Sequence, residues 1–135
     1  MWRILQQPVA EDYVIATGVT TTVRDFVLKS FGYCGIDIEF KGEGENEIGV
    51  VAKCNNPAYQ LETGTEVVAV DKRYFRPTEV DLLIGDATKA KTKLGWVPAC
   101  TLDDLVKDMM ESDIDLFKRE LTLKESGFKT FNQYE

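Results

Sequence analysis

The order of apolar and polar residues along the chain predicts a mixture of short strands and helices. Residues 12–17 (DYVIAT) form a short apolar run before a glycine, which is typical of a strand buried on both faces. Residues 36–40 alternate between apolar and polar side chains, as a half-exposed strand does, and residues 48–52 and 66–70 are two further candidates. The pattern therefore predicts about four short strands.

Two helices are predicted in the first third of the chain. The opening residues form the end of a helix that Pro8 stops. A second helix begins at Thr22, which with Asp25 three residues later forms a capping box, and ends at Gly32. Its predicted apolar face consists of Val23, Phe26, Val27 and Phe31.

Two more helices are predicted in the last third. Asp86 caps a short lysine-rich helix that Gly95 ends, and Thr101 with Asp104 caps a long one. The apolar stripe of the long helix consists of Leu102, Leu105, Val106, Met109, Met110, Ile114 and Phe117. The fold class is thus α/β (α+β-like), in one domain of residues 1–135 whose tail, 128–135, is loosely ordered.

Composition narrows the classes of function. A soluble globular protein of 135 residues, with 44% hydrophobic and 29% charged side chains, is expected to bury about two-thirds of its unfolded surface. A net charge of −7 argues against nucleic acid as a partner, and no apolar run is long enough for a membrane span. Three widely spaced cysteines suit reduced thiols in the cytoplasm.

The chain contains no histidine. This excludes Ser-His-Asp and Cys-His catalysis and removes the commonest general base near neutral pH. Three scattered cysteines do not replace histidine as zinc ligands, so no metal site is predicted.

Positive charge is concentrated between residues 72 and 93, where the sequence contains six basic residues and three acidic ones. Arg76 is the strongest candidate ligand for a phosphate, because its planar guanidinium can bind two oxygens and Pro77 favours an extended backbone before it. Glu79 can accept hydrogen bonds from the two hydroxyls of a ribose. The alternative is a surface ion pair between Arg76 and Glu79.

The same block, YFRPTEVDLLIGDATKAKTKLGW, resembles the GDP-mannose 4,6-dehydratase family of extended short-chain dehydrogenases/reductases. EDYVIATG, TVRDF and TLDDLVKDMM extend the resemblance over most of the chain. It implies that Arg76 contacts the diphosphate of a GDP-sugar and that Glu79 binds its ribose. It also implies that residues 1–31 are a remnant of the edge of the Rossmann domain.

The resemblance implies a lyase that converts GDP-mannose to GDP-4-keto-6-deoxymannose for GDP-fucose and deoxyhexose synthesis. A bound NADP would accept a hydride from C4 of the hexose and return it to C6 after water leaves. The chain has no Tyr-x-x-x-Lys pair and no glycine-rich turn between a strand and a helix. Gly42 and Gly44 lie among acidic residues and are predicted to form a turn. No catalytic or cofactor-binding residue is therefore assigned, and the chain alone is expected to be inactive.

Three interpretations remain open. The chain is the substrate-binding part of such an enzyme, with weak affinity for GDP-mannose or GDP on its own. Alternatively, it is a stand-alone nucleotide-sugar-binding or interaction module that self-associates or completes a separate N-terminal cofactor domain, because apolar surface without neighbours favours association. A shortened reading frame that starts at an internal methionine is the third.

Other polar and aromatic residues receive structural interpretations. Arg24 is expected to be an exposed helix residue, and Trp96 an anchor in the core. Tyr74 and Phe75 are expected to alternate along a strand, with one side chain packed inward. The lysines of the short helix are expected to form a solvated face: Lys89, Lys91 and Lys93.

Overall fold

A computed structural model of the chain describes residues 1–76 and 83–130. The described part consists of helices and one small antiparallel sheet, which is compatible with the predicted α/β class. In chain order the elements are α1 (Trp2–Leu5), α2 (Val23–Tyr33), β1 (Ile36–Lys41), the short 3₁₀ helix η1 (Gly44–Asn46), β2 (Ile48–Cys54), β3 (Glu66–Ala69), α3 (Thr88–Leu94) and α4 (Leu102–Glu125). None of the helices in these two ranges is long and apolar enough to cross a membrane.

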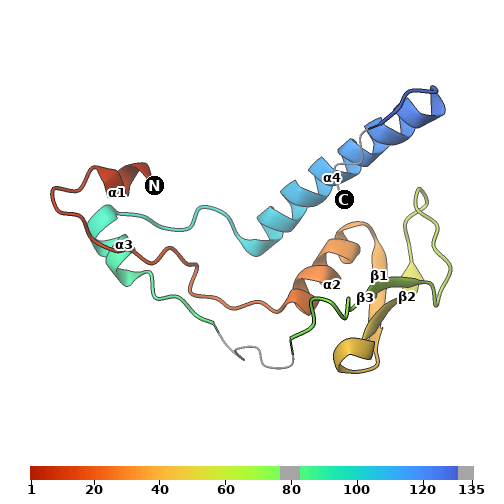
Figure 1. Cartoon of the computed structure of the whole chain (residues 1–135), viewed down its shortest axis with the longest axis horizontal. Helices are drawn as coiled ribbons and strands as arrows, with labels where there is room; N and C mark the ends of the chain where they lie inside the picture. The colour runs from red at the N-terminus through yellow and green to blue at the C-terminus, as the bar shows by residue number, and fades with distance from the viewer. Residues whose placement is uncertain (77–82, 131–135) are drawn as a thin grey trace.

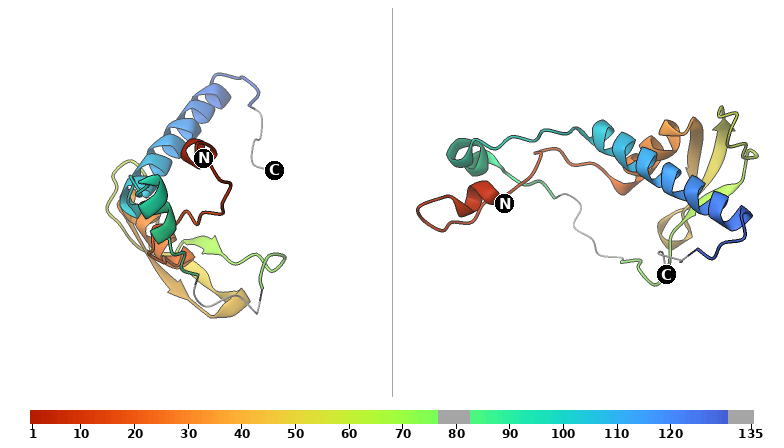
Figure 2. Two further views of the ribbon diagram at one scale, coloured as in Figure 1. Left: turned by 90° about the vertical axis from the view of Figure 1, so that its left-hand side faces the viewer. Right: turned by 90° about the horizontal axis from the view of Figure 1, so that it is seen from above.

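The molecule is elongated, with two groups of elements joined by extended segments (Figure 1). Helices α1 and α3 lie together at one end, where the Arg3 guanidinium donates to the carbonyl of Gly95 at 2.7 Å and to that of Leu94 at 3.3 Å. Helices α2 and α4 lie with the sheet at the other end, and the second view of Figure 2 shows the same separation.

The sheet has the order β1-β2-β3, and both pairs of strands are antiparallel. In β1 the alternation of apolar and polar residues buries Ile36 and Ile38, as the pattern predicts. These residues and Val51, which is 1% exposed, form the core cluster, against which Val27 and Phe31 of α2 pack. All three strands of the sheet were predicted from the sequence.

Helix α2 begins as predicted but ends later. The Thr22 hydroxyl oxygen accepts from the Asp25 backbone N–H at 3.0 Å. The helix passes through Gly32, and Gly35, whose φ of +72° suits only glycine, turns the chain into β1. Val23 is 81% exposed, so its assignment to the buried face is wrong.

The strand predicted at residues 12–17 is absent from the described part of the chain. Val14 and Ile15 are each 51% exposed, so burial on both faces is also wrong. A strand needs a neighbour for its backbone hydrogen bonds, and the sheet of this chain lies at the other end of the molecule (Figure 1). The apolar run therefore has the composition of a strand, but no strand pairs with it here.

The two predicted C-terminal helices are confirmed. Asp86 accepts from the Thr88 N–H at 2.9 Å, and Gly95 ends α3 with a φ of +59°. Thr101 and Asp104 form a complete capping box at the start of α4. Of the predicted α4 stripe, only Val106 is buried, because α2 covers just one side of this helix.

The chain buries less surface than a compact protein of its mass. It exposes 11,095 Å², whereas a compact monomer of 15.2 kDa exposes about 7,100 Å² and its unfolded chain about 22,000 Å². The buried share is therefore about one half, below the two-thirds expected from length. In the described ranges the buried apolar residues are Ile36, Ile38, Val50, Val51, Ala90 and Val106.

Candidate functional site

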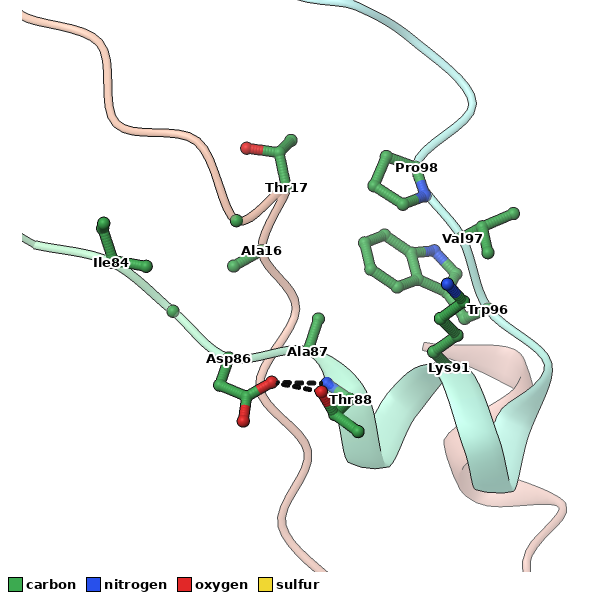
Figure 3. Close-up of a pocket in the computed structure, with 12 residues that line it drawn as sticks. Ala16, Thr17, Ile84, Asp86, Ala87, Thr88, Lys91, Trp96, Val97 and Pro98 are labelled. Atoms are coloured by element: carbon green, nitrogen blue, oxygen red, sulfur yellow. Dashed lines mark hydrogen bonds between the residues drawn. The ribbon is translucent and has the colours of Figure 1, made fainter.

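One cavity of about 440 Å³ lies beside α3, where two extended segments meet this helix. Ala16 and Thr17 come from the first segment and Ile84 to Ala87 from the second (Figure 3). Gly85 allows the close approach, because a Cβ on it would lie 2.6 Å from the Cβ of Ala16. The Thr20 hydroxyl donates to the Leu83 carbonyl at 2.9 Å and holds the same two segments together.

The charged groups of this cavity are Asp86 and Lys91, and Thr17 and Thr88 add hydroxyls. Asp86 accepts from both the backbone N–H and the hydroxyl of Thr88, and these hydrogen bonds hold the pKa of the Asp86 carboxyl below its usual value. Lys91 is exposed and has no ion pair within the described ranges. The cavity thus contains one cation and one anion, and its charge does not by itself favour a phosphate.

Trp96 lines this cavity and a second one beside α1. It is only half-buried, so the expectation of a core anchor is wrong. Figure 3 shows Trp96 and Lys91 on the α3 side of the cavity, opposite Ala16 and Thr17. The sequence did not predict that Trp96 lines a cavity. The pattern that could have indicated it is the lysine-rich helix that is followed directly by Gly-Trp.

Two of the three lysines of α3 bind the extended N-terminal segment. The Lys93 ammonium donates to the two carboxylate oxygens of Glu11 at 2.8 and 2.7 Å, and the Lys89 ammonium lies 3.4 Å from the same carboxylate. Lys89 also donates to the Asp12 carbonyl and lies over the ring of Tyr13. All three lysines are exposed, as predicted, and the charges of Lys89 and Lys93 also attach this segment to α3.

The predicted phosphate ligand, Arg76, is exposed at the end of the first described range. It does not line the cavity and has no hydrogen bond or ion pair with any residue that the structure describes. Its neighbour Arg73, in contrast, binds the Asp71 carboxylate at 2.6 Å. Glu79, the predicted ribose ligand, lies outside the described residues, so the pairing of Arg76 with Glu79 stays a prediction.

The aromatic residues before Arg76 do not form the predicted strand. Tyr74 and Phe75 lie in a turn in which both backbone N–H groups donate to the Asp71 carbonyl. Tyr74 is 77% exposed and Phe75 is 39% exposed, so neither is fully packed inward. The turn forms because the Asp71 side chain also accepts from the Arg73 backbone N–H.

Arg24 lies far along the chain from this turn and has its own partner. It forms an ion pair with Glu47 and lies 5.4 Å from the centre of the Phe40 ring. More than half of its side chain remains exposed, as predicted. Arg24 thus links α2 to the sheet, and its guanidinium is already engaged.

The glycine pair at residues 42 and 44 does not fit the pyrophosphate of a dinucleotide cofactor. Gly42, with a φ of +85°, lies in a bend after β1, and Gly44, with a φ of +62°, is the first residue of η1. The exposed carboxylates of Glu43 and Glu45 lie beside these glycines and would repel a pyrophosphate. No group of three or more metal-ligating side chains occurs in residues 1–76 and 83–130.

Comparisons with known proteins give one consistent result. The family model described as GDP-mannose 4,6 dehydratase matches residues 1–109. The GDP-mannose 4,6-dehydratase of Yersinia enterocolitica is 45% identical over 128 residues, which cover 94% of this chain and 34% of that protein. The human GDP-mannose 4,6 dehydratase is 48% identical over 118 residues, 87% of this chain and 29% of that protein. The chain thus spans about a third of the length of these curated relatives.

Proposed function

The chain belongs to the GDP-mannose 4,6-dehydratase family, and on that premise we propose that it forms the part of such an enzyme that binds the GDP-sugar. Arg76 binds the diphosphate and Glu79 accepts hydrogen bonds from the ribose hydroxyls. The enzyme of which it is a part is a lyase that converts GDP-mannose to GDP-4-keto-6-deoxymannose.

The observation that carries this proposal is the availability of the Arg76 guanidinium. It is exposed and has no described partner, whereas Arg24 and Arg73 are both held by carboxylates. An engaged guanidinium must lose its carboxylate before it can bind a phosphate, while Arg76 meets no such cost from the described residues. Arg76 is therefore the better suited of the three to a diphosphate.

Calorimetric titration with GDP tests this assignment. The Arg76→Ala chain should lose on the order of 2–3 kcal/mol of binding free energy, the contribution of a charged hydrogen-bonded pair, or about 30- to 150-fold in affinity. Arg73→Ala is the matched control, because it removes an arginine three residues away that already has a partner. Equal GDP affinity in the original chain and the Arg76 variant, or no binding by the original chain, would contradict the assignment.

The second part of the proposal is that these 135 residues do not catalyse the reaction alone. Their Gly-x-Gly turn lies among carboxylates that would repel a pyrophosphate, and the sequence contains no Tyr-x-x-x-Lys pair. The large exposed surface favours a chain that completes an NADP-binding polypeptide, either a separate one or another part of the same protein. No product is expected from the chain with NADP and GDP-mannose, whereas mixing it with the cofactor-binding part of a family enzyme should restore dehydration. Turnover by the chain alone would refute this part.

A further inference from the structure

Helix α4 has two apolar rows, and one of them faces α2. The first row contains Val106, which is 3% exposed, and Ile114, which lines a small cavity with Tyr33 of α2. On this side the Lys29 ammonium of α2 lies 2.5 Å from the Asp103 carboxylate, and the Tyr33 hydroxyl donates to Glu111 at 2.7 Å. These contacts fix which side of α4 is covered by α2.

The second row consists of one apolar residue in every seventh position: Leu102, Met109, Leu116 and Leu123. Residues seven apart lie on the same side of a helix, so these four side chains form one stripe along it. Of the positions three residues further on, where a helix seam has its second apolar residue, Ser112 and Arg119 are polar. Leu105 lies on the same side between the first two members. At 100° per residue, Leu116 and Leu123 lie about 160–180° from Ile114, whereas Leu102 and Met109 adjoin Val106.

The second row is partly accessible. Met109 is 43% exposed and Leu123 is 45% exposed, whereas Leu102 and Leu116 are half-buried; Leu105, beside the row, is 46% exposed. At its start, Leu102 and Leu105 line a cavity of about 590 Å³ together with Val19 and Pro98. Figures 1 and 2 show α4 at the edge of the molecule, with its C-terminal half running on past α2. An apolar surface thus continues from this cavity along the helix.

Acidic side chains lie on both sides of the row. Asp108 and Asp115 flank it on one side, and Asp113 and Glu120 on the other; none has an ion-pair partner in the described part of the chain. In a pair of α4 helices these positions would face each other as like charges, whether the helices ran parallel or antiparallel. A second copy is therefore disfavoured, and lysine or arginine at the matching positions is favoured.

We propose that this row and the cavity at its start form a docking surface for a basic amphipathic helix of another polypeptide. The partner places its apolar residues against Met109, Leu116 and Leu123 and its basic residues against the acidic flanks. Arg119 lies at an intervening position of the seam, and its long side chain can extend to solvent beside the bound helix.

The experiment titrates the full chain into two fluorescent synthetic peptides and follows anisotropy. Each peptide has four heptads with leucine at the seam; one carries lysine and the other glutamate at the flanking positions. Like charges keep each peptide from pairing with itself. The lysine peptide should bind in a saturable way that weakens with added salt, and the glutamate peptide should bind at least about tenfold more weakly.

Two leucine variants distinguish docking on the apolar row from non-specific attraction of the lysine peptide to a chain of net charge −7. Leu123→Gln should weaken the lysine peptide about tenfold, because it removes one leucine from the seam. Leu121→Gln is the matched control: Leu121 is 57% exposed on the same helix but outside the row, and its change should leave binding unaltered. Circular dichroism checks that both variants keep their helix.

Three results would overturn the proposal. The first is equal binding of the two peptides, and the second is an equal loss in the two leucine variants. The third is self-association of the chain that Leu123→Gln abolishes, which would make a second copy the occupant of the surface.

Discussion

A pair of glycine substitutions should change stability in opposite directions. A Cβ on Gly85 would lie 2.6 Å from the Cβ of Ala16 and 3.0 Å from Val14, so Gly85→Ala forces the two extended segments apart by nearly 1 Å. The Cβ of Ala16 is attached directly to the backbone and cannot rotate away. Overpacking of this kind costs about 1–3 kcal/mol. Gly32 is the contrast, because it lies inside α2 and a Cβ added to it would meet no atom within 4 Å. Gly32→Ala should therefore stabilise by up to about 1 kcal/mol.

Two probes distinguish the ends of the molecule in a urea titration. Both tryptophans, Trp2 and Trp96, line the cavity between α1 and the end of α3, so fluorescence follows that end. Far-ultraviolet circular dichroism follows mainly α2, α4 and the sheet. Gly85→Ala should lower the fluorescence midpoint, and Gly32→Ala should raise the dichroism midpoint. A Gly85 variant with an unchanged fluorescence midpoint would refute the close approach of the two segments.

Two further predictions concern the core and the N-terminal segment. Val51→Ala should destabilise the sheet by about 2–3 kcal/mol, since two buried methyl groups are lost and a cavity remains; a loss below about 1 kcal/mol in dichroism-monitored melting would contradict this. The hydrogen bond from Lys93 lowers the pKa of the Glu11 carboxyl below 4.5, so its stabilisation is present above pH 4.5 and is lost as the pH falls through the lowered pKa. The urea midpoint followed by tryptophan fluorescence should fall over that acid range; Lys93→Ala should reduce this dependence and Lys91→Ala should retain it.

The elements that depend on neighbouring residues could be predicted from the sequence. The Thr101 and Asp104 capping box forms within four residues, and the alternation in β1 needs only a sheet with one covered face. Gly95 ends α3 for an equally local reason, since its φ of +59° is open to glycine. In each case the interacting groups are close in sequence or repeat with a fixed period.

The features that depend on distant residues could not be predicted. Glu11 binds Lys93, which lies 82 residues further along the chain, and no local pattern specifies that pairing. Trp96 looked like a core residue because large aromatic side chains are usually well buried, but here it lies beside two cavities. Residues 12–17 have the composition of a buried strand without a strand beside them. For the candidate site, the sequence indicated Arg76 as a phosphate ligand, and the structure shows that its side chain is exposed.

Exposed apolar surface and a guanidinium without a described partner have a common physical explanation. Val14 and Ile15 leave half of their surface in water, where burial would yield about 25 cal/mol for each Å² removed. Arg76 similarly makes none of the charged hydrogen bonds that engage Arg24 and Arg73 within the described residues. A second polypeptide surface can bury the former, and a diphosphate can bind the latter. If both belong to one binding event, GDP should bind more tightly once a cofactor-binding partner is present, because the partner fixes the extended segments that the free chain holds through only a few contacts.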